Sequence, residues 1–71
     1  MTTIDEVRAL LGELAEVPRD DEAPLALDSL TLVQLVEAIE DHFGLRVAAL
    51  DVVPARFGSI AAIGRYVDSK R

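Results

Sequence analysis

The chain has 71 residues, 51% of them hydrophobic and 4% aromatic, and it contains no cysteine, which excludes a disulfide framework and a thiolate metal site. We expect one small domain over residues 1–71, stabilised by aliphatic packing. Thirteen acidic against seven basic residues give a net charge of −6, which argues against nucleic-acid binding because that binding depends on Lys and Arg. Because there is no signal-peptide pattern, no membrane-spanning apolar run and no long heptad pattern, we expect a soluble, cytoplasmic monomer.

The first element is a helix predicted over residues 4–16. Thr3 and Glu6 fit a reciprocal capping box at its start. Apolar residues then recur at helical spacing: Ile4, Val7, Leu11 and Leu14. Pro18 disfavours helix at the residue before it, so the pattern predicts the end of the helix near residue 16.

A loop follows over residues 17–27, with two prolines, an acidic run and no periodic signal. It is longer than the ~2–8 residues typical of helix connections, so it can cross the whole bundle. Leu25 and Leu27 are expected to pin its end to the core. The acids at 20–22 lack the alternating ligands and the glycine of a calcium loop, which argues against a metal site there.

A second helix is predicted from Asp28–Ser29 to Phe43, with Gly44 as its C-terminal stop, and either Asp28 or Ser29 could cap its start. A core stripe recurs at steps of four, three and four residues: Leu32, Val36, Ile39 and Phe43, flanked by Val33 and Leu35.

The rest of the chain predicts a short helix over 52–56, with Pro54 in its first turn, and a last helix capped by Ser59. Ile60, Ile63 and Val67 face inward on the last helix, and Tyr66 is expected at the edge of that face. The predicted fold is therefore all-α, with three main helices, one short helix and a long first loop.

Independent catalysis is not expected. Asp28, Ser29 and His42 are the only ingredients for a hydrolytic triad. Ser29 and His42 are thirteen residues apart on one predicted helix, which separates their backbones by about 20 Å, whereas a nucleophile and its base need contact at about 3 Å. His42 is expected on the surface.

The predicted second helix also has an outward face near Ser29. Leu30 lies opposite the core stripe and shares that face with Gln34, Glu37 and Asp41, while Asp28 stands at its head. An exposed leucine beside a hydroxyl and several acids is typical of a docking surface. The alternative is that Leu30 packs under the preceding loop, against Leu25 or Leu27.

The stretch from Leu27 to Gly44 (LDSLTLVQLVEAIEDHFG) resembles the modification site and second helix of acyl carrier proteins. The resemblance continues through the long first loop and Phe57-Gly58-Ser59-Ile60, and it covers essentially the whole chain. It implies an acyl-carrier-like four-helix bundle with no enzymatic activity, and a 4′-phosphopantetheine arm attached covalently to the serine of Asp-Ser-Leu, Ser29. It also implies these partners: a phosphopantetheinyl transferase, an acyl- or aminoacyl-loading ligase, and a downstream synthase or transferase.

Two departures from the pattern of fatty-acid carriers bear on the pathway. Ala26 stands where those carriers usually have glycine, and Thr31 and Gln34 stand where they tend to have acids. This favours a discrete carrier of a specialised pathway, of polyketide or nonribosomal-peptide type, with a D-alanyl or fatty-acid carrier as the alternative. The alternative from another class is a small helical adaptor with no covalent cofactor, in which Ser29 is an ordinary cap.

Overall fold

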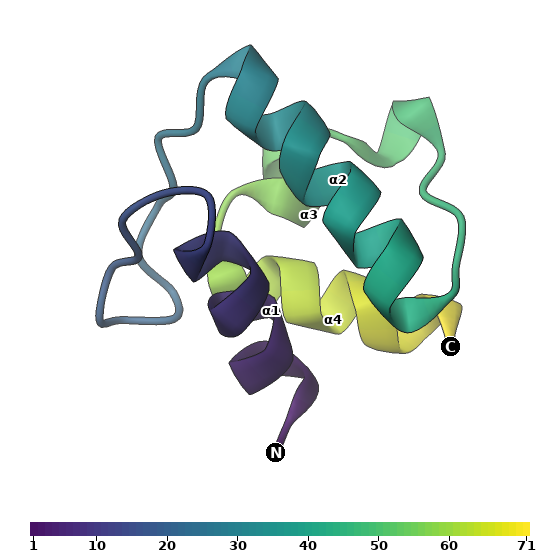
Figure 1. Cartoon of the computed structure of the whole chain (residues 1–71), viewed down its shortest axis with the longest axis horizontal. Helices are drawn as coiled ribbons and strands as arrows, with labels where there is room; N and C mark the ends of the chain where they lie inside the picture. Colours follow the sequence, from purple (N-terminus) through teal and green to yellow (C-terminus); the bar gives the residue numbers. More distant parts are fainter.

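The computed structural model describes all residues, 1–71, and contains only helices and loops (Figure 1). Its elements are α1 (Thr3–Gly12), α2 (Ser29–Phe43), the 3₁₀ helix η1 (Ala49–Asp51), α3 (Pro54–Phe57) and α4 (Ile60–Lys70). The predicted all-α fold, with three longer helices, a short one and a long first loop, is confirmed. None of the helices combines the length and apolar composition needed to cross a membrane.

Helix α4 packs against both α1 and α3, and α1 also packs against α2. Figure 1 shows α2 crossing the molecule diagonally, with its first turn at the top of the view, the N-terminus at the bottom and the C-terminus at the lower right. The largest fully buried side chains come from α1, α2 and α4: Val7, Leu11, Leu35, Ile39, Ile60, Ile63 and Val67. The start of α2 is therefore the end of the bundle that lies far from the termini.

Helix α1 differs from its prediction at both ends. Thr2, not Thr3, is the N-cap, and its partner in the capping box is Asp5, not Glu6. The helix ends at Gly12 instead of near residue 16, because the chain tightens into a turn in which the N–H groups of Leu14 and Ala15 both donate to the carbonyl of Leu11. Leu14 still packs against the core from this turn. The apolar residues therefore keep helical spacing beyond the point where the helix itself ends, which explains why the predicted helix was too long.

The long loop is held by Arg8, a residue of α1. The Arg8 guanidinium donates to the carbonyl of Pro18 at 2.7 Å and to that of Arg19 at 3.1 Å, and it forms an ion pair with Asp21. Arginine suits this position because its several N–H groups project in one plane. The first half of the loop is therefore fixed to α1.

The second half of the loop is fixed to the other side of the bundle. The backbone N–H of Leu25 donates to the carbonyl of Gly58 at 2.8 Å. Leu25 and Leu27 both pack against the core, as predicted. The residues just before α2 are thus held in place, and the position of Ser29 follows from them.

Helix α2 begins and ends where predicted, and Gly44 forms its C-cap with a φ of 66°. This left-handed conformation favours glycine, which has no Cβ. The buried face of α2 is, however, rotated about the helix axis relative to the predicted core stripe. Leu35 and Ile39 are fully buried, Leu32, Val36 and Phe43 are half-buried, and Val33 is 53% exposed.

The predicted short helix over 52–56 is wrong in its bounds. The chain instead forms η1 over 49–51, and α3 begins at Pro54. Val53 is extended, with φ −134° and ψ 160°, because a residue before proline is pushed away from helical geometry. Pro54 occupies the first helical turn, where its missing N–H costs nothing.

Helix α4 is capped by Ser59 as predicted, with the Ser59 hydroxyl accepting from the N–H of Ala62 at 3.0 Å. Ile60, Ile63 and Val67 are fully buried, which also confirms the prediction. Tyr66 is not at the edge of that face, since only 3% of it is exposed. Its hydroxyl donates to Asp51 at 2.7 Å, so the phenol finds a polar partner in η1 while its ring is buried.

The Tyr66–Asp51 contact makes a testable prediction about acid stability. The hydrogen bond from Tyr66 lowers the pKa of Asp51, with a further contribution from the nearby charge of Lys70. Ionised Asp51 therefore stabilises the fold above the ordinary pKa of an aspartate, and this contribution is lost as the pH falls through the lowered pKa. We expect Tyr66→Phe to raise the pKa of Asp51. We also expect the free energy of unfolding of this variant to change less as the pH falls from neutral into the acid range. An NMR titration of Asp51, with urea unfolding at acid and neutral pH, measures both effects; an unchanged pKa would show that Tyr66 does not set it.

Candidate functional site

Ser29 is the first residue of α2, and its side chain is exposed. The capping role at this helix start belongs to Asp28, whose carboxylate accepts the backbone N–H of Thr31 at 2.7 Å. The Ser29 hydroxyl forms no hydrogen bond within the chain. Of the two capping residues that the sequence allowed, the structure selects Asp28, which leaves the Ser29 hydroxyl free for chemistry.

Asp28 is held in its charged form beside this hydroxyl. The hydrogen bond from the Thr31 backbone N–H lowers the pKa of Asp28 below its ordinary value. A carboxylate is also favoured at the positive end of a helix. The contribution of Asp28 to stability is therefore present at neutral pH and is lost only as the pH falls through the lowered pKa.

The two other serines are already engaged in the fold. Ser59 is only 8% exposed, and its hydroxyl caps α4. Ser69 lies in the last turn of α4 and donates to the carbonyl of Tyr66 at 2.7 Å. Ser29 is thus the serine whose hydroxyl is both exposed and unengaged.

The outward face of α2 lies where the sequence predicted it. Leu30 is 68% exposed, which excludes the alternative in which it packs under the loop. The polar members of the face are also exposed: Gln34, Glu37 and Asp41. Neither acid forms a salt bridge within the chain. At 1.5 Å per residue, Asp41 lies about 18 Å along the helix from Ser29, so the face is a strip and not a compact cluster.

Two apolar hollows beside α2 were not predicted. One, of about 170 Å³, lies between the end of the long loop and α3, and Leu32, Val52 and Phe57 are among its lining residues. The other, of about 340 Å³, lies between α2 and the segment that contains η1, and Val33, Val36 and Ala49 are among its lining residues. Leu32 and Val52 border both hollows. Nothing in the sequence indicated the second hollow, because Val33 was predicted to flank the core stripe and only the structure shows it exposed.

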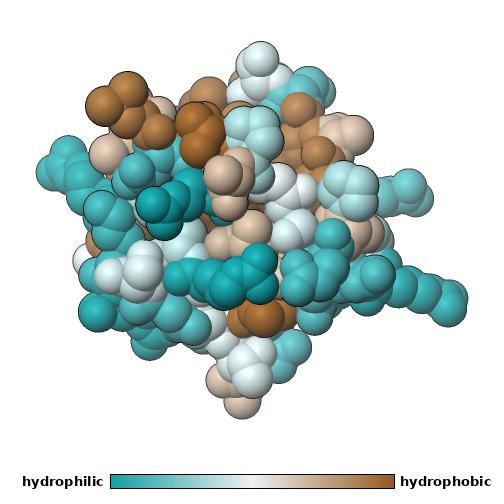
Figure 2. Space-filling view, turned by 180° about the vertical axis from the view of Figure 1, so that it is seen from behind, coloured by the Kyte–Doolittle hydropathy of each residue, from teal (hydrophilic) through white to brown (hydrophobic).

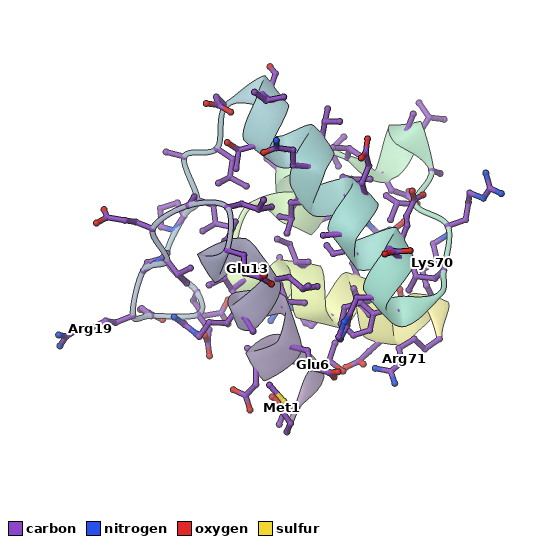
Figure 3. All side chains as sticks on the ribbon, in the orientation of Figure 1. Met1, Glu6, Glu13, Arg19, Lys70 and Arg71 are labelled. Atoms are coloured by element: carbon purple, nitrogen blue, oxygen red, sulfur yellow. The ribbon has the colours of Figure 1, made fainter.

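The remaining polar contacts of α2 lie at its opposite end. His42 is exposed, as predicted, and its Nε2 lies 3.2 Å from Glu6 Oε1. Figure 3 shows Glu6 and Arg71 close to this C-terminal end of α2. No group of His, Asp and Glu side chains is arranged to hold a metal ion. His42 is therefore an interhelix contact, remote from Ser29.

Comparison with known proteins identifies the family. A family model described as a phosphopantetheine attachment site matches residues 5–67, which is most of the chain. No curated protein and no solved structure matches the chain. Domains of this family do not catalyse reactions themselves; they carry 4′-phosphopantetheine covalently on a serine and interact with phosphopantetheinyl transferases and synthases. The resemblance to acyl carrier proteins is thereby confirmed, and the chain belongs to the phosphopantetheine-attachment family as a carrier domain.

Proposed function

We propose that Ser29 is the residue that carries the 4′-phosphopantetheine arm, and that the chain is a carrier of acyl or aminoacyl thioesters. The observation that supports Ser29 is its hydroxyl, which is exposed and unengaged at the head of α2. Only one other serine, Ser59, lies within the residues that match the family, and it is a buried cap. The adaptor alternative treated Ser29 as an ordinary cap, a role that Asp28 performs instead.

The modification is a transfer of one phosphoryl-linked group from coenzyme A. The Ser29 oxygen attacks the phosphorus that bears the pantetheine, and a new O–P bond forms. The P–O bond within the pyrophosphate breaks, so adenosine 3′,5′-bisphosphate leaves, and the hydroxyl proton passes to a base of the transferase or to solvent. The product is a phosphodiester that ends in a flexible thiol.

Cargo would then be held as a thioester on that thiol. Tethering replaces diffusion with a high effective concentration of cargo at each partner enzyme. The chain itself supplies the attachment point and a docking surface. In this proposal it is a cytoplasmic monomer, in the compartment where coenzyme A and a loading ligase are available.

We infer a specialised pathway, of polyketide or nonribosomal-peptide type, from the character of the outward face. The first two turns of α2 expose Leu30, Val33 and Gln34 and contain no acidic residue, and the acids Glu37 and Asp41 come later. A housekeeping fatty-acid carrier would be expected to have acids near the serine. A D-alanyl carrier remains the alternative, and it is distinguished by which ligase loads the thiol.

The proposal is tested by incubating the protein with coenzyme A, magnesium and a broad-specificity phosphopantetheinyl transferase, and then measuring the intact mass. We expect the mass to increase by one phosphopantetheine group. Several transferases should be used because these enzymes are selective. If none of them adds mass to a folded sample, the carrier assignment is wrong.

Recognition of the transferase is expected to involve the outward face of α2. Leu30 would supply an apolar anchor, and truncating such an anchor often costs more than about 1 kcal/mol of binding. Glu37 and Asp41 are exposed, and exposed charge pairs contribute only about 0.2–1 kcal/mol each, in a salt-dependent way. We therefore expect Leu30→Ala to slow modification more than either single acid substitution does.

Thermal melting and modification rate, measured together, check this prediction for Leu30→Ala and for the double variant Glu37→Lys, Asp41→Lys. Slow modification with an unchanged melting temperature supports docking on this face. Modification at the wild-type rate in both variants would place the docking surface elsewhere.

A further inference from the structure

The segment that leads into Ser29, residues 24–27, makes a single hydrogen bond with the rest of the chain. The backbone N–H of Leu25 donates to the carbonyl of Gly58 at 2.8 Å, a contact that we call the loop tether. Residues 24–27 belong to no helix, and the side chains of Leu25 and Leu27 are half-buried. The loop tether is therefore the one directional contact that the fold makes with this segment, four residues before Ser29.

Apolar packing alone does not fix the segment. The hollow of about 170 Å³ lies directly against it, and Leu25, Leu27 and Gly58 are among the residues that line this hollow. Figure 2, a view from behind, shows hydrophobic surface gathered in the upper part of the molecule, the end at which α2 begins in Figure 1. Apolar contacts are non-directional and let a segment shift, whereas a hydrogen bond requires a particular geometry. The loop tether therefore sets the position of the segment along the fold.

The acceptor of the loop tether has to be a glycine for a steric reason. Gly58 has an ordinary φ of −80°, so its backbone conformation does not itself require glycine. A Cβ added at this position would overlap the backbone carbonyl oxygen of Pro54. Because that oxygen belongs to the backbone of α3, it cannot turn aside as the end of a flexible side chain would. A larger residue would displace the backbone of Gly58, and with it the carbonyl that Leu25 needs.

The first half of the loop is held by several contacts instead of one. Arg8 binds two backbone carbonyls and a carboxylate of residues 18–21. The backbone carbonyl of Asp21 also accepts an N–H from the first turn of α4 at 2.9 Å. All these contacts precede Leu25 in the chain, so a disturbance there reaches the loop tether before it reaches Ser29. The position of Ser29 is thus expected to depend on the loop tether and not on Arg8.

We propose that Gly58 is a positioning residue for the modification of Ser29, and that through the loop tether it holds the segment before α2 in the position that a phosphopantetheinyl transferase binds. This inference rests on the proposed function, because it assumes that Ser29 is modified. An ordered segment loses little conformational entropy when a partner docks on it, whereas a loose segment has to be ordered first. That cost arises when the carrier binds, so loss of the loop tether raises KM for the carrier and leaves kcat unchanged.

Two changes remove the loop tether in different ways. Gly58→Ala displaces the acceptor, and an ester analogue made by chemical synthesis, with the α-hydroxy acid counterpart of leucine at Leu25, deletes only the N–H donor. Modification is measured with coenzyme A, magnesium and one broad-specificity transferase that modifies the wild type. We expect each change to raise KM for the carrier about 5-fold, which corresponds to about 1 kcal/mol, with kcat unchanged. In NMR relaxation, the Ser29 amide should become more mobile on the ps–ns timescale.

Two further variants are matched controls. Gly12→Ala is the control for Gly58→Ala, because a Cβ at Gly12 would contact only the side chain of Val17, at an ordinary 3.7 Å. Arg8→Ala releases the first half of the loop and should lower the melting temperature. It should keep the wild-type KM, because the loop tether remains. Circular dichroism shows whether each sample is folded, and if Gly58→Ala does not fold, the ester analogue decides the question.

A raised KM in the ester analogue, together with the wild-type KM in Arg8→Ala, supports the positioning role. A wild-type KM in the ester analogue, or a change in kcat alone, overturns that role while Ser29 remains the attachment point. An equally raised KM in Arg8→Ala also overturns it, because general loosening of the loop would then explain the effect. If the wild type itself is never modified, the failure lies with the proposed function.

Discussion

Replacing Ser29 with alanine is expected to abolish the addition of phosphopantetheine completely. The other two serines have hydroxyls engaged in hydrogen bonds, Ser59 at the cap of α4 and Ser69 with the carbonyl of Tyr66. The variant should remain folded because Asp28 caps α2. As a surface substitution away from the cap, it should change the free energy of unfolding by less than about 0.5 kcal/mol. Intact mass and a thermal melt of the same sample give both results.

Ser69→Ala serves as the control for Ser29→Ala. It removes another serine hydroxyl from the last turn of α4, far from the start of α2, and it should be modified like wild type. Added mass that persists in Ser29→Ala would move the attachment point to another residue. Loss of modification in an unfolded Ser29→Ala sample would instead show that Asp28 alone cannot hold the helix start.

The second large effect is expected in the core. Ile39 is fully buried in α2, and Ile39→Ala removes buried methyl groups and leaves a cavity. Such truncations cost about 2–5 kcal/mol. Small domains have a total stability of only about 5–15 kcal/mol, and a 71-residue chain is expected near the lower end. We therefore expect Ile39→Ala to lose a large share of the stability of the domain, as measured by urea denaturation followed by circular dichroism.

Val33→Ala is the matched control on the same helix. Val33 is 53% exposed, so losing its methyl groups should change stability by no more than about 0.5 kcal/mol. Equal losses for Ile39→Ala and Val33→Ala would mean that α2 is rotated about its axis relative to the structure. That rotation would also misplace Leu30 and the outward face.

Features set by local chemistry could be predicted from the sequence. The bounds of α2 followed from Asp28 at its start and Gly44 at its end, whose side-chain and backbone properties specify a cap and a stop. Ser59 marked the start of α4 in the same way. At α1, Thr2 and Thr3 can both cap a helix and are followed at the right spacing by Asp5 and Glu6, so spacing alone did not decide between them.

Features that depend on tertiary contact could not be predicted. Tyr66 is buried because Asp51, fifteen residues away, lies within reach of its hydroxyl. Arg8 holds the loop because Pro18 and Asp21 are folded back onto α1. The half-burial of Val36 reflects how α2 is turned against its neighbours, which its own periodicity does not specify.

The same division applies to the site. The exposure of Leu30 is a local property of a helix start and could be predicted from the sequence. Whether Asp28 or Ser29 caps α2 could not be, and the structure decides it in favour of Asp28. The hollow between α2 and η1 arises from two segments that pack only in the folded chain. The exposure of Leu50 also depends on the tertiary fold and could not be predicted from the sequence.

The central claim is that the arm is attached to Ser29, and fragmentation mass spectrometry of the modified wild-type protein tests it most directly. The modified protein would be digested, and the peptide that carries the added group would be fragmented to locate it. The proposal predicts the whole phosphopantetheine group on the Ser29 side chain, between Asp28 and Leu30. Finding the group on Ser59, on Ser69 or on any other residue would contradict the account.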